Sequence, residues 1–268
     1  MRILCAIILA SRDLEDKMKI IKDMSYSVLK DDMHKIDLHM PDGKCRALLV
    51  YFHGGGFVEG SRDLDLLPHF AEDMTEAGIA VASVEYSMYP EAQYPDFVED
   101  AAEAVAYAKR ELLPLAKCEK LIVSGTSAGA YLTMMLCFDE MWLGKYGVSN
   151  EDITAYVHDA GQPTAHFNVL KERGIDPSSV VIDEAAPIFH VKKCDYPPMH
   201  FIVSDNDIPD RLNQTKMMID KLKKCGYPEA KISSVITHGT HVWYVTKVDP
   251  DGKNEFAKII IPFINKNV

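Results

Sequence analysis

The stretch from Leu121 to Met135 constrains the fold of this chain more than any other part of the sequence. It consists of a short apolar run, the pentad Gly-Thr-Ser-Ala-Gly at 125–129, and then small and apolar residues that suit a helix. Glycine permits a turn too tight for side chains, so the pattern predicts a strand-to-helix elbow that presents the Ser127 hydroxyl to solvent. Such pentads also occur by chance, because glycine and serine are common turn residues. The flanking strand and helix therefore carry the prediction that Ser127 is a nucleophile.

Strands and helices are predicted to alternate along most of the chain. The expected strands are 20–27, 35–40, 45–52, 79–86, 121–126, 199–203 and 232–236, and the expected helices are 64–77, 95–113, 128–135, 212–226 and 256–264. The first two strands are expected to be antiparallel edge strands. The alternation predicts an α/β fold with a mostly parallel central sheet and helices on both faces. The length of 268 residues fits one such domain over 1–268.

Residues 140–176 interrupt this alternation with several turn signals. We interpret the region around 140–190 as a cap or irregular insertion over the site. The alternative is a plain surface connection, because irregular segments often carry no function.

Charge and cysteine spacing exclude several classes of partner. The formal charge of −11, without a cluster of Lys and Arg, argues against nucleic acid. The six cysteines lack the spacing of a zinc site or of a disulfide framework, which predicts free thiols and a cytoplasmic location. No segment reaches the roughly 20 apolar residues that span a bilayer. The apolar run at 3–10 resembles a short signal peptide, so a secreted protein is the alternative.

A serine nucleophile needs a base that takes its proton and an acid that orients the base. Asp207 follows the strand 199–203, and His241 follows the next strand, so both are expected at the sheet edge that carries Ser127. The chain order serine, acid, histidine is that of an α/β-hydrolase triad. Competing residues lie nearby in sequence: Asp205 and Asp210 for the acid, and His238 for the base.

The reaction also needs hydrogen-bond donors for a tetrahedral oxyanion. The backbone N–H of Ala128 follows the nucleophile directly, and Gly55 and Gly56 follow the strand 45–52 at the same sheet edge. A flexible turn or a phosphate cradle is the alternative for these glycines. A phosphate-binding loop needs a lysine and a helix that begins directly after the glycines, and neither follows Phe57.

Two motifs together resemble a known family. His-Gly-Gly-Gly-Phe at 53–57 with Gly-Thr-Ser-Ala-Gly at 125–129 is similar to the hormone-sensitive-lipase-like branch of the α/β-hydrolases, and to small carbohydrate and feruloyl esterases. Further matches are Ile36, Asp37, Leu38, Pro41, Tyr86, Pro90, Pro95 and Asp100. The resemblance implies a Ser127, Asp207 and His241 triad with an oxyanion hole at Gly55, Gly56 and Ala128.

The sequence departs from that family in two places. Ser87 stands where many members have an arginine, which removes an ion-pair partner from Asp100, and the chain lacks a long amino-terminal helical cap. The second departure suggests an open site.

The function predicted from these features is a serine carboxylesterase for short-chain acyl esters, with acetyl esters of carbohydrates as the preferred substrates. It implies a small-molecule ester as the partner, and no cofactor or metal. Phe57, Met88, Tyr89, Phe167 and Trp243 are the candidate substrate-binding residues, with core packing as their alternative role. An arylformamidase or amidase would use the same triad. A peptidase of this fold usually carries an extra domain, and a non-catalytic binding protein would typically lack the nucleophile or base. The sequence leaves the oligomeric state open, a homodimer included.

Overall fold

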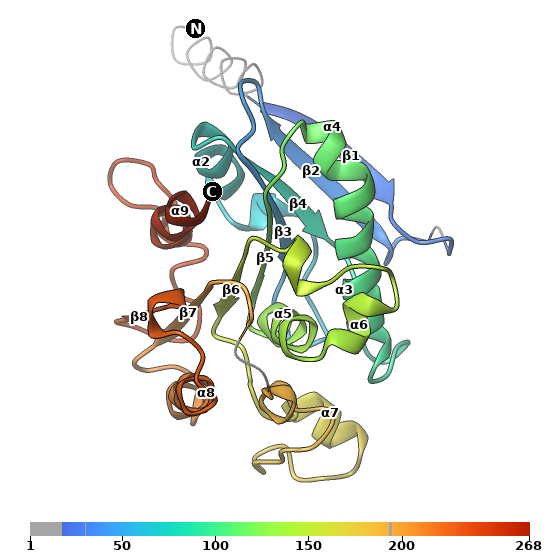
Figure 1. The fold of residues 1–268 in the computed structure, drawn as a ribbon, viewed down its shortest axis with the longest axis vertical. Helices are drawn as coiled ribbons and strands as arrows, with labels where there is room; N and C mark the ends of the chain where they lie inside the picture. Colours follow the sequence, from blue (N-terminus) through green and yellow to red (C-terminus); the bar gives the residue numbers. More distant parts are fainter. Residues whose placement is uncertain (1–17, 30, 193–194) are drawn as a thin grey trace, which may run out of the picture.

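One twisted sheet of eight strands forms the centre of the protein in a computed structural model, which describes residues 18–29, 31–192 and 195–268 (Figure 1). The strands are β1 (Met18–Ser25), β2 (Lys35–Pro41), β3 (Ala47–Phe52), β4 (Ile79–Val84), β5 (Leu121–Thr126), β6 (Ala155–Asp159), β7 (Met199–Ser204) and β8 (Ile232–Thr237). Their order is β1-β2-β4-β3-β5-β6-β7-β8. The pairs β1·β2 and β2·β4 are antiparallel and all others are parallel. The predicted mostly parallel sheet is confirmed, but of the two strands expected at the edge only β1 lies there, because β2 pairs on both sides.

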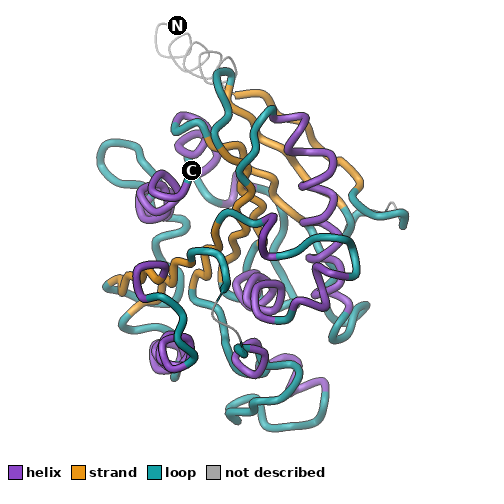
Figure 2. The backbone as a smooth tube through the Cα atoms, viewed as in Figure 1, coloured by secondary structure: helices purple, strands orange, loops and turns teal. Residues whose placement is uncertain are grey.

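Helices cover both faces of this sheet (Figure 2). They are η1 (Leu64–Leu66), α2 (Phe70–Glu76), α3 (Asp96–Tyr107), η2 (Ala108–Leu112), α4 (Leu113–Ala116), α5 (Ala128–Phe138), α6 (Glu140–Gly144), η3 (Asn150–Asp152), α7 (Phe167–Glu172), η4 (Pro187–His190), α8 (Arg211–Lys224), η5 (Glu229–Lys231) and α9 (Glu255–Asn267). Side chains alternate across each strand, so β3 directs Leu48 and Val50 to a core shared with α3 and α5. Leu49 and Tyr51 face the opposite core, which α2 and α9 close.

Two of the predicted helices are interrupted or extended by a change of helix type. The helix expected over 64–77 is split into η1 and α2, because Pro68 cannot donate an amide hydrogen bond and restricts the residue before it. The helix expected to end at 113 continues through the π-helical turn η2 into α4 and accommodates Pro114. It ends at Lys117, which has a left-handed φ of 53°.

The interpretation of residues 140–190 requires a correction. This range contains β6, which pairs with β5 on one side and β7 on the other, and so it is not wholly a cap or insertion. The strand is short and ends in His158 and Asp159, whereas a buried parallel strand is expected to be uniformly apolar. The irregular segment is therefore the described part of 160–198, in which α7 and η4 lie at the lower end of the molecule in Figure 1.

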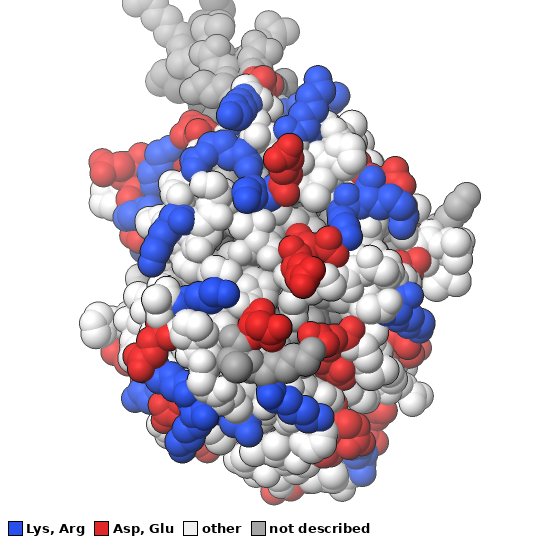
Figure 3. Space-filling view, viewed as in Figure 1, with Lys and Arg blue, Asp and Glu red and all other residues white. Residues whose placement is uncertain are grey.

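Charged side chains of both signs are interspersed on the face drawn in Figure 3. This distribution differs from the continuous basic stripe that nucleic acid requires. Within the described ranges, every helix is too short or too polar to cross a membrane. The apolar run at 3–10 lies outside the described residues, so its assignment stays a prediction.

Candidate active site

Ser127 occupies a strained turn between β5 and α5. Its φ of 54° and ψ of −110° are rare for a residue with a side chain. The two flanking glycines make this turn sterically feasible: a Cβ on Gly125 would lie 2.4 Å from the carbonyl carbon of Gly129, and one on Gly129 would lie 2.1 Å from the oxygen of Phe52. Close backbone packing therefore explains both glycines of the pentad and directs the Ser127 side chain away from the sheet.

The Ser127 hydroxyl begins a continuous series of hydrogen bonds. Its Oγ lies 2.9 Å from Nε2 of His241, and the other ring nitrogen, Nδ1, lies 2.6 Å from Oδ1 of Asp207. The Asp207 side chain is 1% exposed and also accepts hydrogen bonds from the amides of Ile208 and Ser204. The loops after β7 and β8 thus bring the predicted acid and base to the predicted nucleophile.

The competing acid and base candidates lie elsewhere. His238 pairs with Asp205 at 2.7 Å, and its side chain is 93% exposed. Asp210 is the exposed residue before α8, with a left-handed φ of 64°. Of the candidates weighed from the sequence, only His241 and Asp207 form the hydrogen-bonded series with Ser127.

The glycine loop after β3 lies against this series. Gly55 and Gly56 have left-handed φ values of 113° and 63°, and the carbonyl of Gly55 accepts hydrogen bonds from the amides of Val58 and Glu59. Among the described residues, none accepts a hydrogen bond from the amides of Gly55, Gly56 or Ala128. Ala128 is the first residue of α5, where amides lack a partner within the helix. These three N–H groups are therefore available to an oxyanion.

A cavity of about 560 Å³ opens at Ser127. His241 and the glycine loop form part of its wall, and its apolar lining includes Leu66, Leu67, Phe167, Ile208, Val242 and Val245. Its volume lies within the range typical of small-molecule sites. Of the five candidate substrate-binding residues, Phe167 lines this cavity.

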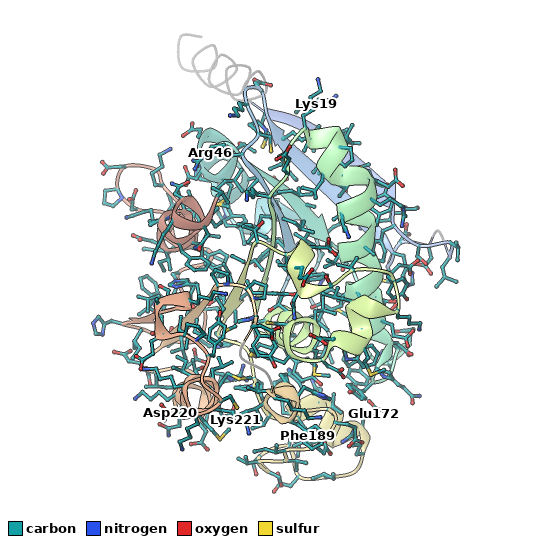
Figure 4. All side chains as sticks on the ribbon, in the orientation of Figure 1. Lys19, Arg46, Glu172, Phe189, Asp220 and Lys221 are labelled. Atoms are coloured by element: carbon teal, nitrogen blue, oxygen red, sulfur yellow. The ribbon has the colours of Figure 1, made fainter. Side chains whose placement is uncertain are left out.

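The other four candidates lie outside the wall of this cavity. Phe57 is fully buried and stacks on Phe97, with ring centroids 4.1 Å apart. Met88 and Tyr89 line a neighbouring cavity of about 650 Å³, and the Tyr89 hydroxyl donates to Glu172 of α7, labelled in Figure 4. Trp243 packs with the core on the α9 side of the sheet. Core packing, the alternative noted for aromatic residues, thus accounts for Phe57 and Trp243.

Asn168 is a site residue that the sequence did not identify. It lies in α7, its Nδ2 donates to the carbonyl of Gly56 at 2.6 Å, and it lines the cavity at Ser127. The contact spans 112 positions of sequence, so no local pattern indicates it. Part of segment 160–198 therefore supports the glycine loop directly.

Among the described residues, no group of three or more His, Cys, Asp or Glu side chains is placed to hold a metal ion. Of the six cysteines, the four within the described ranges, Cys45, Cys118, Cys137 and Cys225, are free thiols.

Comparison with known families identifies the fold. Residues 49–242 match the family model described as alpha/beta hydrolase fold. Because the match covers more than half of the chain, this protein belongs to the α/β-hydrolase family, and the predicted fold class is confirmed.

Two relatives bear out the resemblance seen in the motifs. Human hormone-sensitive lipase is 31% identical over 156 residues, which is 56% of this chain and 13% of the lipase. The acetyl esterase of Salmonella schwarzengrund is 32% identical over 108 residues, or 40% of this chain and 32% of the esterase. The matches thus span less than a third of the first protein and about a third of the second.

Solved structures share the fold at low sequence identity. Esterase B from Lactobacillus rhamnosis superimposes with a TM-score of 0.73 at 16% identity, covering 99% of this chain and 92% of the esterase. A carbohydrate esterase from gut microbiota superimposes with a TM-score of 0.74 at 15% identity, covering 94% and 98% of the two chains. These structures are named as ester hydrolases, and at such identities their likeness to this chain concerns the fold alone.

Proposed function

We propose that this protein is a serine carboxylesterase that hydrolyses short-chain acyl esters through an acyl-enzyme. The observation that carries the proposal is the hydrogen-bonded series from Ser127 through His241 to Asp207, beside three available backbone amides. A serine alone is a weak nucleophile, and this arrangement supplies both the base and the group that orients the base.

In the acylation step, Ser127 Oγ attacks the ester carbonyl while His241 Nε2 takes the hydroxyl proton. Asp207 accepts a hydrogen bond from the Nδ1–H of His241, so it fixes the tautomer and stabilises the imidazolium. The carbonyl oxygen becomes an oxyanion within reach of the amides of Gly55, Gly56 and Ala128. One such donor is typically worth about 2.7 to 4 kcal/mol. The tetrahedral intermediate collapses, and the leaving alcohol takes the proton from His241.

In the deacylation step, a water molecule repeats this chemistry on the acyl-enzyme. His241 takes a proton from the water, whose oxygen attacks the acyl carbon, and the same amides hold the second oxyanion. Collapse of this intermediate breaks the bond to Ser127 Oγ, which recovers its proton from His241. The products are one carboxylic acid and one alcohol for each ester and water consumed.

The proposed substrates carry a short acyl group. The name of the Salmonella relative supports an acetyl group, and the carbohydrate esterase among the structural neighbours suggests a sugar as the alcohol. Apolar residues such as Leu67, Phe167 and Val242 offer a surface for a small acyl chain. The cytoplasmic location that the cysteine spacing predicts is likewise part of this proposal.

The test compares hydrolysis of p-nitrophenyl acetate, butyrate and octanoate by the wild type and by Ser127→Ala. We expect kcat to fall by more than about a thousandfold, because the nucleophile is lost. Ser178→Ala is a matched control, since this exposed serine hydrogen-bonds only locally with Asp176. A chain-length profile that falls from acetate to octanoate supports the short-acyl assignment. An inactive wild type, or a fully active Ser127→Ala, would refute the esterase proposal.

The same assay separates an esterase from an amidase. Formanilide and p-nitroacetanilide present amide bonds to the same Ser127 and His241 pair. We expect kcat/KM for p-nitrophenyl acetate to exceed that for both amides. A higher value for formanilide would assign the site to an arylformamidase instead.

A further inference from the structure

A buried carboxyl group lies directly beneath the nucleophile turn. Asp159 ends β6, is fully buried, and pairs in register with Thr126 of β5. Its backbone carbonyl accepts the amide of Ser127 at 2.7 Å. Its side chain accepts the Thr126 hydroxyl at 2.8 Å and also the hydroxyl of Tyr244. Tyr51 extends the network by donating to Thr126 Oγ1 at 3.1 Å.

The two donors to this carboxyl group lie next to the reacting side chains, one at the end of β5 and the other in the loop after β8. Thr126 immediately precedes Ser127, and Tyr244 lies three positions after His241. Tyr244 is fully buried, so the packing of its ring and the hydrogen bond of its hydroxyl both fix the position of the loop. One carboxyl group therefore connects the nucleophile turn to the histidine loop from below.

This carboxyl group has no cationic partner within the described parts of the chain. Burial, together with the nearby Asp207 charge, raises the pKa of Asp159 to about 7, although its hydrogen bonds oppose the rise. An apolar side chain would suit a central parallel strand better than an unpaired acid does. The packing of the sheet therefore does not explain an acid at this position, whereas the hydrogen bonds from Thr126 and Tyr244 do.

We propose that Asp159 is a positioning residue, which holds the Ser127 turn and the His241 loop at the separation that proton transfer requires. This inference rests on the proposed esterase function. The hydrogen bond from Ser127 Oγ to His241 Nε2 spans the same two loops at 2.9 Å, so a shift of either loop lengthens it. Misplacement of a reacting group by about 1 Å can cost a hundredfold in rate.

The test removes the network one oxygen at a time. Tyr244→Phe deletes one hydroxyl, Thr126→Val deletes the other, and Asp159→Asn replaces the carboxyl group with an amide of similar shape. We expect each to lower kcat for p-nitrophenyl acetate on the order of 10- to 100-fold, with KM within about twofold of the wild type. Thr126→Ser, which keeps a hydroxyl, is expected to have a higher kcat than Thr126→Val.

Tyr227→Phe is the matched control for Tyr244→Phe. Tyr227 is also a buried tyrosine, and it donates its hydroxyl to the carbonyl of Pro197, away from Ser127. We expect both variants to lower the melting temperature by similar amounts, and only Tyr244→Phe to lower kcat. In the Asp159→Asn/Tyr244→Phe double variant the losses in kcat should be non-additive, because both single changes alter the same contact.

The positioning role is overturned if Tyr244→Phe keeps the wild-type kcat, if Tyr227→Phe loses as much, or if the two losses are additive. Ser127→Ala in the same series distinguishes this outcome from failure of the proposed function. An active wild type with an inactive Ser127→Ala retains the esterase even if Asp159 has no positioning role. Should Asp159→Asn fold poorly, Tyr244→Phe and Thr126→Val still decide the question through kcat and KM.

Discussion

Nε2 of His53 lies 2.9 Å from Oε1 of Glu85, and both side chains are buried. His53 begins the glycine loop after β3, and Glu85 follows β4. The other ring nitrogen of His53 lies 2.6 Å from the carbonyl of Gly54. The glycine loop is thus attached through its first residue to a carboxylate just after the neighbouring strand, and this contact orients the amides that follow.

Replacement of Glu85 is therefore expected to reduce the rate. Glu85→Gln keeps the size of the side chain and removes the charge that the His53 ring contacts. We predict a fall in kcat of about tenfold, because the oxyanion donors are less well oriented. Steady-state kinetics on p-nitrophenyl acetate measure this change. Glu111→Gln, at an exposed pair with Arg110, is the control, and equal rates in both variants would contradict the prediction.

Gly55 is expected to tolerate no side chain. A Cβ at this position would lie 1.8 Å from the carbonyl oxygen of Glu59, and its φ of 113° is rarely adopted by other residues. Gly55→Ala should force the loop away from Glu59 and displace one or more of the amide donors. We therefore expect kcat/KM to fall at least about a hundredfold. Gly43→Ala is the control, because nothing lies within 4 Å of its Cβ position. Comparable kcat/KM values for the two variants would show that Gly55 does not shape the site.

Asp207 and His238 provide a contrast between buried and exposed candidates. Asp207→Asn leaves the shape intact but favours the wrong tautomer of His241, so we expect kcat to fall by about a thousandfold or more. His238→Ala removes a side chain that is 93% exposed and should leave kcat close to that of the wild type. If instead His238→Ala were the inactive variant, the assignment of the base to His241 would be wrong.

The sequence predicts those parts of the site that depend on local geometry. The turn at Ser127 follows from two glycines and a strand–helix junction within a few residues, and the chain order of Asp207 and His241 follows from the topology of parallel strands. The sequence pattern does not predict β6, because His158 and Asp159 interrupt the apolar run of this strand. Each of the two residues makes a long-range hydrogen bond: the Thr133 hydroxyl contacts Nδ1 of the His158 ring, and Thr126 donates to the Asp159 carboxyl group.

The cavity wall could not be predicted in the same way. Phe57 follows the glycine loop directly, yet its left-handed φ of 66° directs the ring into the core against Phe97. Asn168 reaches Gly56 from a segment more than a hundred positions away. Side-chain direction and such distant contacts depend on tertiary packing, which neither periodicity nor motif spacing describes.

Asp100 has a partner that the sequence did not reveal. In place of the arginine expected at Ser87, the ring of His34 lies 3.1 Å from Asp100 and 2.6 Å from Asp31. Burial alone would lower the pKa of His34, but the hydrogen bond to Asp31 and the charge of Asp100 outweigh it and raise the pKa. The stabilisation is full below the unfolded-state pKa of about 6.5 and is lost as pH rises through the folded value.

This linkage gives a measurable pH dependence. The free energy of unfolding of the wild type should exceed that of His34→Gln most at pH 5.5 and least at pH 8.5, since the imidazolium is the form that the two carboxylates stabilise. Urea denaturation at several pH values across that interval measures the difference. A difference that stays constant, or that grows with pH, would contradict the ion pairing of His34.

Replacement of Asp159 is also expected to change the pH dependence of stability. Its pKa of about 7 lies above the ordinary aspartate value of 3.8, with burial as the largest cause. Between those two values the folded protein retains a proton that the unfolded chain has lost, so this residue makes stability fall as pH rises. Above about pH 7 the Asp159 carboxyl group is ionised in both the folded and the unfolded protein, so its contribution to stability stays constant.

Asp159→Asn removes that titration while Asp207, Tyr51 and Tyr244, the other titratable groups around the carboxyl group, remain. The free energy of unfolding of Asp159→Asn, relative to the wild type, should therefore rise from pH 4.5 to 7 and level off above it. Urea denaturation measures both proteins at each pH. A relative stability that is flat or falling over that interval would mean that Asp159 is ionised throughout. Its two hydroxyl donors would then stabilise the charge more strongly than burial and Asp207 oppose it.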